Sequence, residues 1–148
     1  MRYLLSTLTT LAWALWFGGL ATMFVVTRAT FRESHDLGRA ANPVMFRTFE
    51  PYILVVAGLA TVSAVAWLAL NRSLPLRVIA VLLVLSAIAA GYAHYGVSRP
   101  MQSLSPSSDQ WKSLHARSMI LYTTQSALLT LTGLLLPTAM RDRKPTAS

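Results

Sequence analysis

The chain has 148 residues and a net charge of +8, but only 12% of its residues are charged, against about 25% in an average soluble domain. All 13 basic and five acidic residues lie outside four apolar stretches, which are residues 3–27, 52–70, 78–97 and 118–136. Such stretches exclude a soluble globular domain, whose helices keep a polar face, and a disordered chain. Because the basic residues flank apolar stretches, we expect no nucleic-acid partner.

Each stretch is long enough to cross a bilayer, since a hydrocarbon core of ~30 Å needs roughly 20 apolar residues in a helix. Backbone groups in lipid must be satisfied internally, which favours helices. Residues 78–85 show none of the alternation that a β-barrel strand requires. The sequence therefore predicts an all-α four-helix transmembrane bundle, a single integral membrane domain over residues 1–148 with lipid as its main partner. The first stretch is too long for a cleaved signal peptide.

The first helix is expected over residues 3–27, or as far as Arg32, followed by a charged loop to about residue 41. Asn42 suits an N-cap and Pro43 a first helical position, so the second helix is expected to begin there, before the membrane. Pro51 would then kink this helix near the interface. The segment 71–77 is short, which makes the second and third helices antiparallel neighbours.

The fourth helix is predicted to start outside the membrane, because Ser107 and Gln110 have the spacing of a capping box. Pro137 is expected to end it, which leaves residues 137–148 as a basic C-terminal tail. Six basic residues lie densely on the side of the two termini and of segment 71–77, against seven in longer loops on the other side. This bias favours both termini inside a bacterial cytoplasmic membrane.

His94, near the end of the third helix, is the only Asp, Glu, Lys, Arg or His within the four stretches. Such a residue is expected to face the bundle or water, with Tyr92, Tyr95 or His115 as partner. Topology also places His35, His94 and His115 on one side of the membrane, together with several methionines. Imidazole and thioether are ligands of copper and haem iron. The alternatives are therefore a haem or copper site with His94 and His115, joined by His35, or local hydrogen bonds.

The fourth helix carries a polar seam at three-four spacing, made of His115, Ser118, Tyr122 and Gln125, and continued by Leu129 and Thr132. An unsatisfied Gln125 amide would be costly in mid-membrane, so we expect it inside the bundle. It can serve interhelical hydrogen bonds or line a ligand or proton pathway. The aromatic stripe of Trp13 and Trp16, followed by Gly18-Gly19, is more typical of packing than of a cofactor site.

Four segments carry a family resemblance: residues 12–20 with Trp16-Phe17-Gly18-Gly19, Phe49-Glu50-Pro51-Tyr52, Ser98-Arg99-Pro100 and Leu114-His115-Ala116-Arg117-Ser118. In this order they resemble the transmembrane protein 205-like family of small four-span membrane proteins. Tyr122 stands where that family has an Asn, and Glu50 interrupts its Phe-Pro pair. The resemblance implies the fold and a membrane location, because the family has no settled activity. A more distant likeness is to four-span copper-resistance and haem-binding membrane proteins.

Three functions follow as hypotheses. The first is a non-enzymatic accessory or small-solute-handling membrane protein, in which His115, Ser118 and Tyr122 orient the fourth helix. The second is the haem- or copper-handling protein, and the third is a homo-oligomeric pore or carrier with a water-lined seam. The sequence has no cysteine, no catalytic motif and no paired intramembrane carboxylate, so it nominates neither a catalytic set nor a proton pump, and the cofactor stays unknown. A homo-oligomer or a membrane-protein partner is possible in each case.

Overall fold

The computed structural model describes residues 1–141, apart from the side chains of residues 39–43. Its long helices are α1 (Arg2–Glu33), α2 (His35–Leu70), α3 (Leu74–Tyr92) and α5 (Asp109–Arg141). A π-helical turn, η1 (Ala93–Ser98), and the short α4 (Arg99–Met101) continue α3. Residues 1–141 contain no β-strand, and four helical segments are long and apolar enough to cross a membrane. The predicted all-α four-helix membrane bundle is confirmed.

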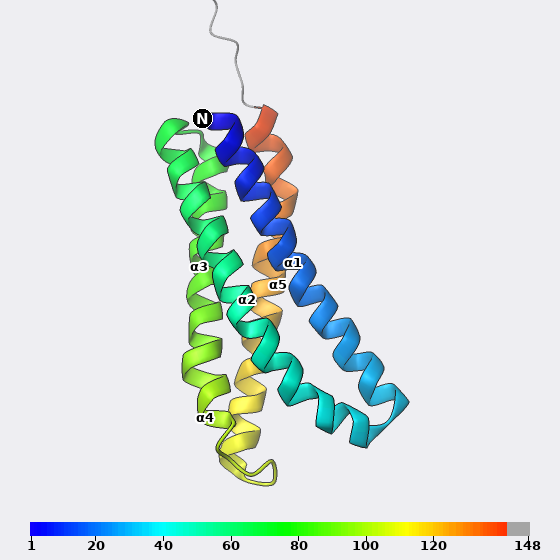
Figure 1. The fold of residues 1–148 in the computed structure, drawn as a ribbon. Helices are drawn as coiled ribbons and strands as arrows, with labels where there is room; N and C mark the ends of the chain where they lie inside the picture. The colour runs from blue at the N-terminus through cyan, green and yellow to red at the C-terminus, as the bar shows by residue number, and fades with distance from the viewer. Residues whose placement is uncertain (142–148) are drawn as a thin grey trace, which may run out of the picture.

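The helices run alternately up and down the bundle (Figure 1). α1 and α2 form a hairpin, α3 returns beside α2, and α5 runs back along α3 to finish beside the start of α1. We call the end where α1 begins and α5 finishes the terminal end, and the opposite end the loop end. Toward the loop end, the α1–α2 hairpin leans away from α3 and α5, so the bundle forks there.

Trp16 is fully buried in the interior of the bundle, together with Ile79, Leu83 and Leu129. Large apolar side chains cover much of the outside as well, including Val55, Val62, Ile88, Ile120 and Leu134. An apolar outer surface of this kind is what a lipid-facing helix bundle presents.

The first two helices meet at a single residue, so the predicted charged loop is wrong. α1 continues to Glu33 and α2 begins at His35, rather than near Pro43. Ser34 lies between them in extended conformation, and its Oγ accepts a hydrogen bond from the Leu37 backbone N–H at 3.4 Å. This cap satisfies an otherwise free N–H group and permits the abrupt turn. The expected cap at Asn42 and Pro43 concerns side chains outside the described set.

α2 runs without interruption through Pro51. A proline inside a helix cannot donate to the carbonyl four residues before it. Figure 1 shows α2 changing direction between the part coloured cyan and the part coloured green.

α5 also differs from its prediction at both ends. Ser108 rather than Ser107 caps it, because Ser108 Oγ accepts from the Trp111 backbone N–H at 3.2 Å, whereas the Ser107 hydroxyl pairs with Ser105. Pro137 lies inside the helix, which continues to Arg141; transmembrane helices tolerate such prolines. At 1.5 Å per residue α5 is about 50 Å long, so it extends beyond a ~30 Å hydrocarbon core. Residues 142–148 of the predicted tail lie outside the described residues.

Candidate functional site

A buried carboxylate is the centre of the candidate site. Glu50 belongs to α2, lies within the candidate span Val44–Leu70 and is only 5% exposed. Its Oε2 atom lies 2.8 Å from His94 Nδ1. Its Oε1 atom accepts hydrogen bonds from the Tyr122 hydroxyl, at 3.0 Å, and from the Ser98 hydroxyl. The carboxylate therefore joins α2 to η1 and α5, and we call these four residues the Glu50 cluster.

The π-helical turn brings two of the donors to the carboxylate. His94 and Ser98 lie four residues apart in η1, and both reach Glu50. π-Helical turns inserted in α-helices are rare and are found frequently at functional sites. Here the turn places a ring nitrogen and a hydroxyl group on the same side of the chain.

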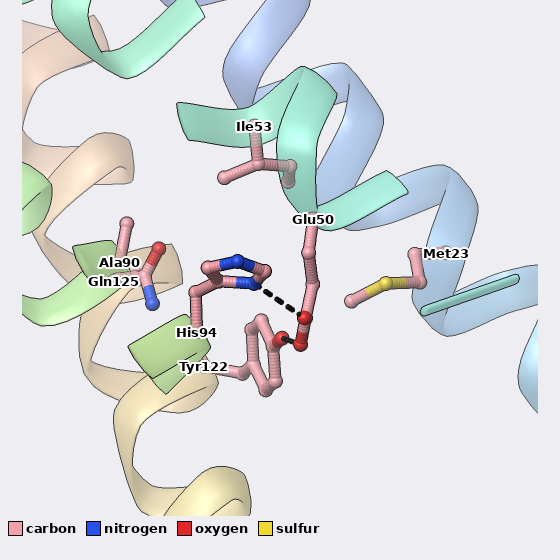
Figure 2. Close-up of a pocket in the computed structure, with 7 residues that line it drawn as sticks. All are labelled: Met23, Glu50, Ile53, Ala90, His94, Tyr122 and Gln125. Atoms are coloured by element: carbon pink, nitrogen blue, oxygen red, sulfur yellow. Dashed lines mark hydrogen bonds and ion pairs between the residues drawn. The ribbon is translucent and has the colours of Figure 1, made fainter. Parts of the chain in front are cut away.

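A small cavity adjoins the cluster and is lined by Met23, Glu50, Ile53, Ala90, His94, Tyr122 and Gln125 (Figure 2). The space open to the centre of a water molecule is about 10 Å³, which is room for about one water. Gln125 is fully buried, and neither its Oε1 nor its Nε2 atom has a hydrogen-bond partner among the described residues. A water or a small polar ligand in this cavity would satisfy the buried amide.

Three of the lining residues carry ionisable side chains, namely Glu50 on α2, His94 in η1 and Tyr122 on α5, while α1 contributes Met23. A carboxylate beside a neutral imidazole carries one negative charge, and one further proton makes the pair neutral overall. Burial favours the neutral arrangement, and the hydrogen bonds stabilise the charged one. A carboxylate oxygen or a ring nitrogen of this pair is therefore a chemically suitable acceptor for a proton, which binds by forming an O–H or N–H bond.

His94 pairs with Glu50, and of its three predicted partners only Tyr95 makes a ring contact with it among the described residues. His115 is exposed and stacks on Trp111, with ring centroids 4.9 Å apart. The Tyr95 ring packs edge-on against His94 at 4.7 Å, and Tyr92 is exposed.

The three histidines do not form one site in the structure. His35 contacts Phe31, with ring centroids 5.8 Å apart. Within residues 1–141, apart from the side chains that are not described, no group of three or more His, Cys, Asp or Glu is arranged to hold a metal ion.

The predicted seam of α5 divides between the interior and the outside. Ser118 and Gln125 are buried, Tyr122 is half-buried, and His115 is exposed. Ser118 donates to the backbone carbonyl of its own helix at His115, 2.7 Å away, rather than to another helix.

The two tryptophans of α1 have different roles in the packing. Trp13 Nε1 donates to the Leu129 carbonyl on α5 at 2.8 Å, whereas Trp16 is fully buried and its Nε1 atom has no partner among the described residues. Of the two glycines, Gly19 faces the Tyr52 ring and Gly18 faces open space.

Glu50 is the functional residue that the sequence analysis missed, because it lies two residues before the charge-free stretch 52–70. Continuing the helical period back along α2 would have found it. Ile53, Ala57 and Ala60 are buried at three-four spacing, and Glu50 lies one turn before Ile53 on the same face.

The fold and the cluster define an integral membrane bundle with a buried, hydrogen-bonded carboxylate. A family model described as a domain of unknown function (DUF4149) matches residues 11–110. This match covers more than half of the chain, so the protein belongs to that family. The finer resemblance to transmembrane protein 205-like proteins stays a prediction. No curated protein and no solved structure matches the chain.

Proposed function

We propose that this protein is a non-enzymatic membrane protein that handles a small solute, and that the solute is a proton bound at Glu50 and His94. The observation that supports this most strongly is the buried Glu50 carboxylate with three hydrogen-bond donors from η1 and α5. Ionisable groups inside membrane proteins are costly and commonly mark proton relays or ion pathways. The adjoining cavity has room for about one water, so the bound species is small.

The position of the cluster along the bundle supports exchange with water at the loop end. Glu50 lies about 20 residues, or about 30 Å, from the end of α2 at Leu70, which is close to the full thickness of a hydrocarbon core. His94 is 15% exposed and Glu50 only 5%. His94 is therefore the more exposed of the two groups, and in this proposal it faces water at the loop end with Glu50 behind it. With both termini inside, the site would open on the non-cytoplasmic side.

A purely structural role is the competing explanation, since the same hydrogen bonds also fasten α2 to α3 and α5. Infrared difference spectroscopy of the protein in lipid nanodiscs, titrated with acid, separates the two. We expect the carbonyl band of one protonated buried carboxyl group to grow as pH falls, and to be absent in Glu50→Gln. Glu33→Gln, which removes an exposed acid at the end of α1, is the matched control and should keep the band.

His94→Gln should keep that band but move the pH at which it grows, because the substitution removes the imidazole that lies 2.8 Å from the carboxyl group. If Glu50→Gln has the same difference spectrum as the wild type at every pH where both are folded, Glu50 does not bind a proton. The cluster would then be a structural link between helices.

Copper handling keeps one specific observation in its favour. Met23 and His94 line the same cavity, and a thioether with an imidazole suits Cu(I); His115 and His35 take no part in this arrangement. Titration with Cu(I) under reducing conditions should show binding that Met23→Leu and His94→Gln both abolish. Met119→Leu, on the exposed face of α5, is the control. Haem is disfavoured because the cavity is far too small for it.

A homo-oligomeric pore or carrier, and an accessory role beside a membrane-protein partner, stay predictions. The bacterial cytoplasmic membrane and the orientation with both termini inside stay predictions too.

A further inference from the structure

Three fully buried side chains in the bundle interior carry polar atoms without a partner among the described residues. They are Gln125 on α5, through Oε1 and Nε2, Trp16 on α1, through Nε1, and Ser86 on α3, through Oγ. Each leaves a donor or an acceptor inside an apolar interior, which is unfavourable when nothing binds it. The polar groups of the Glu50 cluster already hydrogen-bond to one another. The cluster therefore does not supply partners for the unpartnered atoms of Gln125, Trp16 and Ser86.

Contacts between the helices place these residues in order along the bundle axis. Trp13 donates to Leu129 on α5, and α1 and α5 run in opposite directions. Trp16, one turn beyond Trp13, is therefore about level with the stretch between Leu129 and Gln125. In the direction of the terminal end, Gln125 comes first after the Glu50 cluster and Trp16 follows.

Ser86 comes next. The Thr61 hydroxyl on α2 donates to the Leu83 carbonyl at 3.5 Å, so Ser86 is about level with Gly58, two turns of α2 beyond Glu50. Along the axis Trp16 is therefore nearly level with Gln125, and Ser86 lies about one helical turn, or about 5 Å, farther on, an axial separation that one or two waters can span.

Buried hydroxyl groups continue the series to the terminal end. Thr132 on α5 is fully buried, and Thr9 on α1 donates to Ser63 on α2 at 3.0 Å. Ser6 lies about one turn before Thr9, in the first two turns of α1, and is 3% exposed. We call the residues from Gln125 to Ser6 the polar file.

We infer that the polar file holds waters that connect the Glu50 cluster to the terminal end, and that the protein conducts protons across the membrane along it. This inference rests on the proposed proton binding at Glu50. A buried water typically makes about three hydrogen bonds to otherwise unsatisfied groups, and the unpartnered atoms of Gln125, Trp16 and Ser86 are groups of that kind. In each transfer a water accepts a proton on its oxygen and releases another to the next, so only O–H bonds form and break.

The two kinds of group have separate tasks in this path. The Trp16 N–H group and the Gln125 amide hold waters in position and do not themselves relay protons. The Glu50–His94 pair takes up the proton from water at the loop end and passes it to the file.

Proton flux into liposomes tests the path. Purified protein is reconstituted with an entrapped pH-sensitive dye, and valinomycin with a potassium gradient imposes the driving potential. We expect flux above that of empty liposomes, at least ten times lower in Gln125→Leu and clearly lower in Ser86→Ala. Thr124→Val is the matched control, because Thr124 neighbours Gln125 but is exposed on α5, and it should conduct as the wild type does.

The infrared titration of the Glu50 carboxyl group keeps this test separate from the test of the proposed function, and it shows that each variant is folded. Flux lost in Gln125→Leu and Ser86→Ala, with the Glu50 titration retained, supports the path. Wild-type flux no greater than that of empty liposomes, or undiminished flux in both variants, overturns it while proton binding at Glu50 stands. If Glu50 does not titrate, the proposed function itself fails.

Discussion

Replacing Tyr122 by Phe isolates one hydrogen bond of the Glu50 cluster. The Tyr122 hydroxyl donates to Glu50 Oε1 at 3.0 Å, and its ring packs edge-on against Phe46. Phe keeps the ring and its contacts and removes only the oxygen atom. The change in the free energy of unfolding therefore reports the hydrogen bond and little else.

A hydrogen bond to a charged group contributes about 1.5–3 kcal/mol. Glu50 Oε1 also accepts from Ser98, so this oxygen keeps one donor when the Tyr122 hydroxyl is removed. We therefore expect a loss near the lower bound, about 1.5 kcal/mol. Ser98→Ala should cost a similar amount for the same reason.

The double variant with both substitutions should lose more than the two single losses added together. Removing the second donor leaves Glu50 Oε1 buried with no partner, and groups that share an acceptor are coupled by about 0.5–3 kcal/mol. A smaller combined loss would mean that another donor replaces them.

Reversible unfolding in mixed detergent micelles of increasing sodium dodecyl sulfate content, followed by tryptophan fluorescence, measures these energies. Tyr92→Phe is the control, because it makes the same chemical change at a side chain that is 51% exposed, and it should stay within about 0.5 kcal/mol of the wild type. If Tyr122→Phe also stays within that range, the hydroxyl does not bind an ionised Glu50, and the reasoning about the cluster is refuted.

Three further substitutions test the packing of the helices. Gly133→Ala should destabilise the protein by about 1–3 kcal/mol, because a Cβ atom there would lie 2.3 Å from the Trp13 ring. Thr9→Val should cost about 1 kcal/mol, because it breaks the buried 3.0 Å hydrogen bond to Ser63. Ser108→Ala should speed hydrogen exchange in the first turn of α5 and cost about 1 kcal/mol of helix stability, because the cap is lost.

Each substitution has a matched control on the same chain. Gly91→Ala meets no atom within 4 Å and should be neutral or stabilising. Thr10→Val removes a hydroxyl that bonds only within α1, and Ser107→Ala removes the hydroxyl that does not cap α5. The free energy of unfolding and the rate of amide hydrogen exchange are measured for each substitution and its control. A control that is destabilised as much as its partner contradicts the contact assigned to that partner.

The four membrane helices could be predicted from the sequence because the rule behind them is local. Any charged residue in mid-membrane is costly wherever it lies on a helix, so charge-free stretches of the right length identify the spans. The helix ends were harder to predict, because they depend on single hydrogen bonds. Ser34 and Ser108 cap their helices, while Asn42-Pro43 and Ser107 offered equally good patterns.

The Glu50 cluster depends on contacts between helices, which cannot be predicted from the length and charge of each apolar stretch. The hydrocarbon of a bilayer is as apolar as the interior of a helix bundle. Apolar side chains alone therefore do not show which face of a helix points into the bundle. On α2 the large Val55 and Val62 are exposed, whereas the small Ala57 and Ala60 are buried. The inner face of this helix also holds the large Ile53, Val56 and Trp67, so hydrophobicity alone does not distinguish it from the outer face. Followed one turn beyond Ile53, that face reaches Glu50, and three donors on other helices make its burial possible.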